Sequence, residues 1–139
     1  MSLEPNIAHQ IEELCDRGYQ LYDEQSFEAA LRVFYEAWLK LPKPQAQYQQ
    51  AAWVLTAIGD SYYKLSNYSQ SIEALNSALH CPGGQRAFIH TRLAQAYYES
   101  GDKSQSAEHF QKAEEMDPKQ TQKLAPKYRL FIKNNRLKR

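Results

Sequence analysis

LAQAYYESGDKSQSAEHFQKAEEMDP, residues 93–118, carries the clearest structural signal in this chain of 139 residues. Apolar residues recur in it at helical spacing, and the strict alternation of a β-strand is absent. Turn-forming residues, Ser100-Gly101-Asp102, divide the stretch, and Pro118 closes it. The stretch therefore predicts two helices joined by a tight turn, with the small residue Ala94 on the first.

Two earlier stretches repeat this pattern when Gly18 and Gly59 are aligned with Ala94. Each unit has a large apolar residue three positions later, another 16 positions later and an alanine 19 positions later: Leu21, Tyr62 and Tyr97; Phe34, Leu75 and Phe110; Ala37, Ala78 and Ala113. A proline closes each unit at Pro42, Pro82 and Pro118. A small residue lets the second helix approach closely, and the large residue fills the space beside it. Stacking such hairpins would bury the hydrophobic face that each leaves open.

These positions resemble the tetratricopeptide repeat, a helix–turn–helix unit of 34 residues, over residues 11–44, 52–84 and 87–120. Leu14 stands where the family often has tryptophan, and Ser71 and Ser106 replace alanine. The resemblance implies an all-α, right-handed superhelix that forms a single domain over residues 1–139. We expect about seven helices, near residues 6–24, 27–41, 44–65, 68–80, 85–99, 103–116 and 121–134.

An insertion separates the first two units, because Gly18 and Gly59 are 41 residues apart whereas Gly59 and Ala94 are 35 apart. The surplus lies between Pro44 and Ala51, and Pro44 suits the first position of a helix. Compared with the 34-residue unit of the repeat the surplus is seven residues, nearly two helical turns, so the insertion predicts a longer helix around Trp53. The added turns would be a solvent-exposed helix end or a wall of a binding groove.

Charge is unevenly distributed although the net charge is only +1. Residues 1–116 hold nine Lys/Arg and fifteen Asp/Glu, net −6, whereas residues 117–139 hold eight Lys/Arg and one acid, net +7. Leu124, Tyr128, Phe131 and Ile132 share one face of the predicted basic helix at 121–134. We interpret this helix as a cap on the last hairpin. The alternatives are a nucleic-acid or membrane-surface binder, which the acidic body disfavours.

The resemblance also implies where a partner binds, since the first helices of such hairpins line a concave groove. The predicted groove residues are mainly aromatic: Tyr19, Tyr22, Trp53, Asp60, Tyr63, Phe88, Arg92, Gln95 and Tyr98. Tyr22, Tyr63 and Tyr98 occupy the same repeat position, where tyrosine suits either a protein interface or packing within the repeat.

One subset of the family clamps the C-terminal carboxylates of chaperones with basic and amide side chains. The matching positions here are Cys15, Tyr19, Ala57, Phe88 and Arg92, of which only Arg92 agrees. The sequence thus favours a less charged peptide or helix as the ligand.

Catalytic patterns are not recognisable. His9, His80, His90 and His109 are scattered, and Cys15 and Cys81 fit no metal spacing and are expected to be reduced. Gly83-Gly84 lacks the preceding strand of a phosphate loop and predicts a turn. We therefore expect no enzyme activity, catalytic residue, metal, cofactor or small-molecule substrate. No apolar run reaches 18 residues, and residues 1–20 lack a secretory signal, so a cytoplasmic protein without a transmembrane segment is expected.

The sequence favours a protein–protein interaction module, an adaptor or scaffold that binds a peptide or helix in an aromatic-lined concave groove. One alternative is a dedicated bacterial secretion-type chaperone that protects a single partner. Another is a nucleic-acid or membrane-surface binder acting through the basic C-terminal helix. Pairing of two copies through the first hairpin, as a homodimer, is also open.

Overall fold

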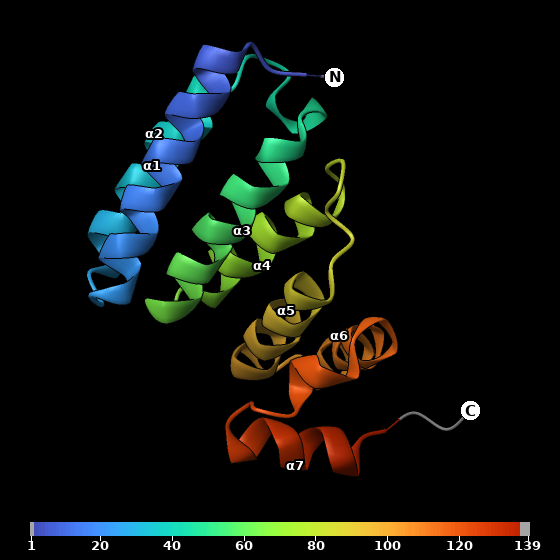
Figure 1. Cartoon of the computed structure of the whole chain (residues 1–139). Coiled ribbons are helices and arrows are strands. Elements are labelled where there is room, and N and C mark those ends of the chain that lie inside the picture. The colour runs from blue at the N-terminus through green and yellow to red at the C-terminus, as the bar shows by residue number, and fades with distance from the viewer. Residues whose placement is uncertain (1, 137–139) are drawn as a thin grey trace. The chain divides into compact units, whose positions relative to one another are not determined.

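A computed structural model describes residues 2–136 of the chain. Across these residues it shows seven α-helices, two short 3-10 helices and no strand (Figure 1). The α-helices are α1 (Pro5–Asp23), α2 (Phe27–Lys40), α3 (Gln49–Lys64), α4 (Tyr68–Leu79), α5 (Ala87–Ser100), α6 (Lys103–Met116) and α7 (Pro126–Asn134). The 3-10 helices are η1 (Gln45–Gln47) and η2 (Pro118–Thr121). The all-α class and the number of helices are confirmed.

The helices fall into two compact units, Met1–Gly84 and Gln85–Arg139. The first unit contains the hairpins α1–α2 and α3–α4, and the second contains α5–α6 followed by α7. Lys138 and Arg139, which contribute to the predicted basic tail, lie outside the described residues. The single-domain organisation stays a prediction.

Close approach of paired helices depends on the small residue predicted in each first helix. At Gly59 an added Cβ would lie 2.6 Å from Cγ of Leu75, and at Gly18 it would overlap the Phe34 ring. Both large side chains are fully buried, so neither has space to move aside. These glycines therefore fix the spacing of α1–α2 and α3–α4.

The two serines that replace alanine use this close approach. Ser71 Oγ donates a hydrogen bond of 2.8 Å to the carbonyl oxygen of Gly59, and Ser106 Oγ donates one of 2.8 Å to that of Ala94. Both serines are fully buried, and the bonds satisfy hydroxyls that would otherwise be costly to bury. The second and third hairpins thus carry a side-chain bridge between their helices.

The tight turns also share one geometry. Gln25, Ser66 and Gly101 each lie seven residues after the small residue, and their φ angles are +66°, +62° and +94°. This left-handed conformation favours glycine, which only the third hairpin has. The next amide in each turn donates to a carbonyl five residues back, as from Ser26 to Leu21, from Asn67 to Tyr62 and from Asp102 to Tyr97. These bonds hold the left-handed residue in place.

The predicted lengthening of the helix around Trp53 is wrong. Residues 45–47 form η1, Tyr48 is extended, and α3 begins at Gln49 with 16 residues, fewer than the 19 of α1. Tyr48 is only 6% exposed and belongs to the hydrophobic core of the first unit. The insertion thus forms a folded connection that buries an aromatic ring, because burial of that ring outweighs two turns of solvent-exposed helix.

The C-terminal helix is shorter than the predicted 121–134. It begins at Pro126, and Ala125 before it is extended, with ψ 148°. A proline disfavours helical backbone at the preceding residue, so the helix cannot extend back through Ala125. Tyr128 and Ile132 on α7 are buried with Ala94 and Phe110 in one cluster, so α7 covers the last hairpin as predicted.

Substituting Gly59 with alanine tests the close approach of α3 and α4. Alanine favours a helix over glycine by about 1 kcal/mol, but overpacking against Leu75 costs about 1–3 kcal/mol. We expect Gly59→Ala to lower the free energy of unfolding, measured by urea denaturation. In a Leu75→Ala background the clash is removed, and the same substitution should be neutral or stabilising. A stabilising effect in the wild-type background would contradict the proposed constraint.

Candidate protein-interaction surface

Exposed aromatic side chains occur on the first helix of every hairpin. Tyr19 on α1 is 37% exposed, Trp53 on α3 is 46% exposed and Phe88 on α5 is 40% exposed. Tyr35 is the remaining aromatic residue in this exposed class among residues 2–136, and it lies on a second helix, α2. Large aromatic surfaces in water favour contact with another protein.

The three tyrosines at equivalent positions each contact the start of the second helix of their own hairpin. Tyr22 packs edge-on against Phe27 with ring centroids 5.1 Å apart, and Tyr63 packs against Tyr68 at 5.8 Å. In the third hairpin the corresponding partner is Lys103, whose ammonium lies 3.4 Å from the centre of the Tyr98 ring. These contacts favour the packing interpretation, and all three side chains remain partly exposed.

Tyr98 is also covered by the C-terminal helix. Its ring makes edge-on contacts with Tyr128 and Phe131, with centroids 5.2 Å and 5.1 Å apart. The equivalent surface in the last hairpin is therefore partly occupied by the cap.

The polar residues predicted to line the groove lie in different environments. Asp60 is 3% exposed and Gln95 is 7% exposed, whereas Arg92 is partly exposed. Arg92 donates a hydrogen bond of 3.3 Å to Oε1 of Gln95, and its guanidinium carbon lies 5.7 Å from the centre of the Phe88 ring. Arg92 and Phe88 thus form one exposed cationic–aromatic patch on α5.

Lys127 and Tyr128 on α7, and Arg136 just after it, are joined to two glutamates of the third hairpin. Oε2 of Glu99 on α5 accepts from the Tyr128 hydroxyl at 2.6 Å and pairs with Lys127 Nζ at 2.7 Å. Oε2 of Glu114 on α6 pairs with Arg136 at 3.5 Å. Part of the basic face therefore holds the cap in place, which reduces the charge available to nucleic acid or a membrane.

Burial by itself would raise the pKa of Glu99. Hydrogen bonds from Lys127 and Tyr128 and the positive charges of Lys127 and Lys103 lower the pKa. Together they outweigh the effect of burial, so the pKa of Glu99 lies below its usual value of 4.5. Ionised Glu99 is therefore stabilised when α7 is docked.

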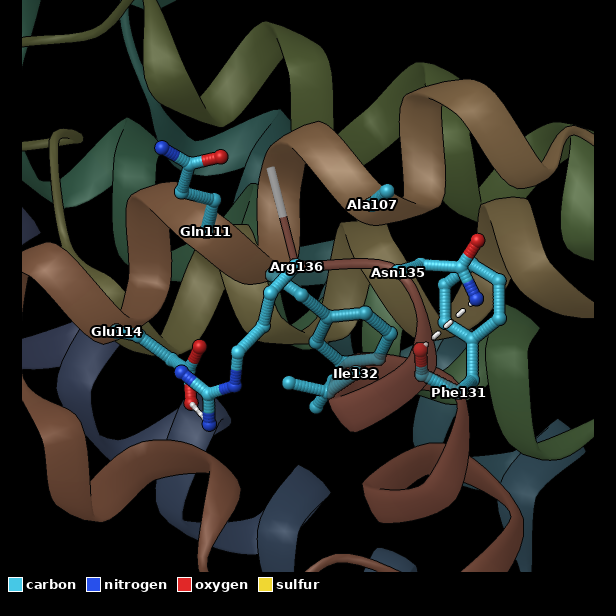
Figure 2. Close-up of a pocket in the computed structure, with 8 residues that line it drawn as sticks. Ala107, Gln111, Glu114, Phe131, Ile132, Asn135 and Arg136 are labelled. Atoms are coloured by element: carbon cyan, nitrogen blue, oxygen red, sulfur yellow. Dashed lines mark hydrogen bonds and ion pairs between the residues drawn. The ribbon is translucent and has the colours of Figure 1, made fainter. Parts of the chain in front are cut away.

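A pocket of about 230 Å³ lies between α6 and the end of α7. Figure 2 shows Glu114 and Arg136 paired at one part of it and the Asn135 amide bonded to the Phe131 carbonyl at another, at 3.0 Å. Phe110, Phe131 and Ile132 provide apolar lining. Sequence reasoning missed this pocket, because it identified the apolar face of the cap but not how closely that face fits α6.

A second cavity, of about 190 Å³, lies in the first unit among α2, α3 and α4. Trp38, Leu55 and Ile58 line its apolar part, and the hydroxyls of Tyr35 and Tyr62 share a hydrogen bond of 2.9 Å beside it. Burial, followed by the bond to Tyr62 and the charges of Tyr62 and Glu73, raises the pKa of Tyr35 to about 12. Tyr35 and Trp38 are three residues apart on α2, so they share a face of that helix. This spacing is the sequence signal that indicates an aromatic surface here.

The cysteines and the possible metal ligands of the described residues show no reactive or metal-binding arrangement. Cys15 and Cys81 are free thiols; burial, then Asp16, raises the pKa of Cys15 to about 11, and burial raises that of Cys81. A raised pKa leaves few thiolates at neutral pH. Residues 2–136 contain no group of three or more His, Cys, Asp or Glu placed to hold a metal ion. Nor does any helix there have the length and apolar character needed to cross a membrane.

Hairpins that pair a small residue with a large one, closed by a capping helix, define an α-helical repeat protein. Residues 87–120, which contain α5 and α6, match the family model of the tetratricopeptide repeat. The third hairpin is thus similar to a tetratricopeptide repeat, and the described part of the chain has an all-α fold of that type. No curated protein matches it in sequence.

Several solved structures share this fold. The APC/C hetero-tetramer Cut9–Hcn1 superposes with a TM-score of 0.72 at 22% identity, covering 88% of this chain but only 22% of that chain. The Yersinia enterocolitica type III secretion translocator chaperone SycD, crystallised as an alternative dimer, gives 0.72 at 12% identity and 91% coverage of both chains. PcrH in complex with the chaperone binding region of PopB gives 0.67 at 14% identity and 90% coverage of both. Identities this low show the fold alone.

Removing the charge of Glu99 tests how α7 is held. We expect Glu99→Gln to lower the free energy of unfolding at pH 7 by about 1 kcal/mol, since a hydrogen-bonded ion pair is lost at a partly exposed site. Because the folded-state pKa is depressed, this contribution is present above pH 4.5 and disappears as the pH falls through the lower folded value.

Chemical denaturation at several pH values measures the difference between wild type and variant. Glu108→Gln, at an exposed position on the same hairpin, is the matched control and should change little. Equal stability of wild type and Glu99→Gln at pH 7 would show that the pair does not hold the cap.

Proposed function

We propose that the chain is an interaction module that binds a peptide or helix of a partner protein through the first helices of its hairpins. The observation that carries this proposal is the exposure of Tyr19, Trp53 and Phe88, one on each first helix. Exposed aromatic rings provide large apolar contact area at small entropic cost, so they are frequent anchors of protein interfaces.

The partner is expected to present apolar side chains together with polar backbone. Trp53 and Phe88 would contact the apolar groups, and Arg92 beside Phe88 offers a cation for a carbonyl or carboxylate of the ligand. Three tyrosines at equivalent positions would contribute less to binding, because each already packs within its own hairpin. They are Tyr22, Tyr63 and Tyr98. Asp60 and Gln95 would orient neighbouring side chains from buried positions.

A dedicated one-partner chaperone is the second candidate. The full-length similarity to SycD and PcrH favours it, because this chain spans 91% and 90% of those proteins. Structures of SycD with a peptide of the translocator YopD and of PcrH with a region of PopB show those proteins with peptide ligands. A chaperone of this kind would bind one client at fixed stoichiometry, and an adaptor would bind several partners more weakly. A cytoplasmic location and a homodimer are compatible with both.

Substitution of exposed aromatic residues tests the proposed surface. We expect Trp53→Ala combined with Phe88→Ala to reduce capture of the specific partner from native lysate at least tenfold, since truncating such anchors costs about 1–4 kcal/mol of binding. Quantitative mass spectrometry of the captured proteins measures this loss, and circular dichroism should show unchanged helicity.

Leu39→Ala is the matched control, because Leu39 is 76% exposed but lies on α2. It should leave capture unchanged. Loss of the partner with Leu39→Ala and retention with the aromatic variant would move the interface to the second helices and reject the proposal.

A further inference from the structure

Two buried histidines join the helices of the third hairpin. Nδ1 of His90 on α5 and Nδ1 of His109 on α6 are 3.0 Å apart, a hydrogen-bond distance. The side chains belong to residues that are only 4% and 7% exposed. Neither histidine takes part in the surface described above, and sequence spacing alone had placed them as isolated residues.

The other two hairpins have apolar residues at both equivalent positions. Counting from the small residue of each first helix, His90 corresponds to Leu14 and Leu55. Counting from the large residue of each second helix, His109 corresponds to Val33 and Ala74. The third hairpin therefore has a polar, titratable pair where its siblings have an apolar pair. Packing alone does not require this exchange, since the siblings fold without it.

The hydrogen-bond partners of the two rings favour one placement of the ring protons. The Nε2 atom of His90 is 3.3 Å from Oε1 of Gln85, and because a carbonyl oxygen accepts a hydrogen bond, we assign the ring proton of His90 to Nε2. Its Nδ1 is then an acceptor, and the proton of the bond between the rings belongs to Nδ1 of His109. Both imidazoles are neutral in this arrangement, and Nε2 of His109 is the ring nitrogen that would take the first added proton.

Added protons are poorly tolerated by this arrangement. A first proton on Nε2 of His109 leaves the bond between the rings intact but places a positive charge inside the hairpin. A second proton would have to bind Nδ1 of His90, so two N–H groups would face each other 3.0 Å apart and the bond would be lost. The unfolded chain binds both protons without this cost.

Burial and a neighbouring cation also oppose protonation of the two rings. On α6 the ammonium of Lys112 repels a charge on either ring, and on α5 the ring of Tyr97 stacks on His109 with centroids 5.6 Å apart. An aromatic face attracts a cation, but the other effects outweigh it. Burial, then His90 and Lys112, lowers the pKa of His109 from 6.5 to about 4, and burial and Lys112 also lower that of His90.

We propose that His90 and His109 form a proton-binding switch that keeps α5 and α6 together at neutral pH and loosens this hairpin in mild acid. The direction in which stability changes with pH follows from the linkage between proton binding and folding. Because the folded pKa of His109 is below the unfolded value, the unfolded chain binds more protons between pH 6.5 and about 4, and stability falls as the pH decreases through that window.

Hydrogen exchange of the full chain tests the switch against a variant in which the sibling pair is restored, His90→Leu with His109→Val. After correction for intrinsic exchange, the opening constant of α5 and α6 amides in the wild type should rise roughly 20-fold from pH 7 to pH 5, the factor that linkage gives for the shift of one histidine. In the double variant the rise should be much smaller. An equal rise in both proteins would overturn the proposal.

A second measurement needs no variant. Nitrogen-detected titration of the imidazoles in the wild-type chain should show His90 protonated on Nε2 and His109 on Nδ1 at pH 7, with His109 gaining a proton only near pH 4. Titration of both rings near pH 6.5, or the same tautomer for both, would overturn the proposal even if the double variant failed to fold.

Discussion

The close approach of two helices at a small residue is the constraint from which the rest of each hairpin follows. Where Gly59 faces Leu75, a single added carbon would already overlap the neighbouring side chain. Only at that separation can the hydroxyls of Ser71 and Ser106 reach a carbonyl of the opposite helix. The left-handed residue in each turn then closes the hairpin at a fixed distance from the small residue. Spacing, bridge and turn are thus parts of one geometry.

Sequence patterns predicted this geometry because it depends on residues at fixed intervals. Gly18, Gly59 and Ala94 identified all three hairpins, and their boundaries followed within a few residues. The connections were harder to predict. Burial of Tyr48 depends on a core assembled by distant residues, so local helix preference gave the wrong result for residues 44–48. The first residue of α7 was predictable from the sequence, since Pro126 disfavours helical backbone at Ala125.

The candidate surface was predictable only in part. Repeat position correctly placed aromatic residues on the first helices, but it could not distinguish a ring that packs locally from one that faces solvent. Tyr63 and Trp53 lie on the same helix, yet Tyr63 packs against Tyr68 whereas nearly half of Trp53 is exposed. The histidine pair was missed because each histidine was compared with its neighbours along the chain. Comparing equivalent positions among the hairpins would have exposed it.

Each hairpin is made mainly from contacts between residues close in the sequence, as in the bridge between Gly59 and Ser71. Such locality shortens the loops that must close before native contacts form, and it favours rapid folding. Because synthesis proceeds from the N-terminus, the unit ending at Gly84 could complete its core while later residues are still being made. In the second unit α5 and α6 are synthesised before α7, so Phe110 and Tyr98 stay uncovered until α7 has been made. Docking of α7 is then the step that removes the rings of Tyr98 and Phe110 from contact with other, unfolded chains.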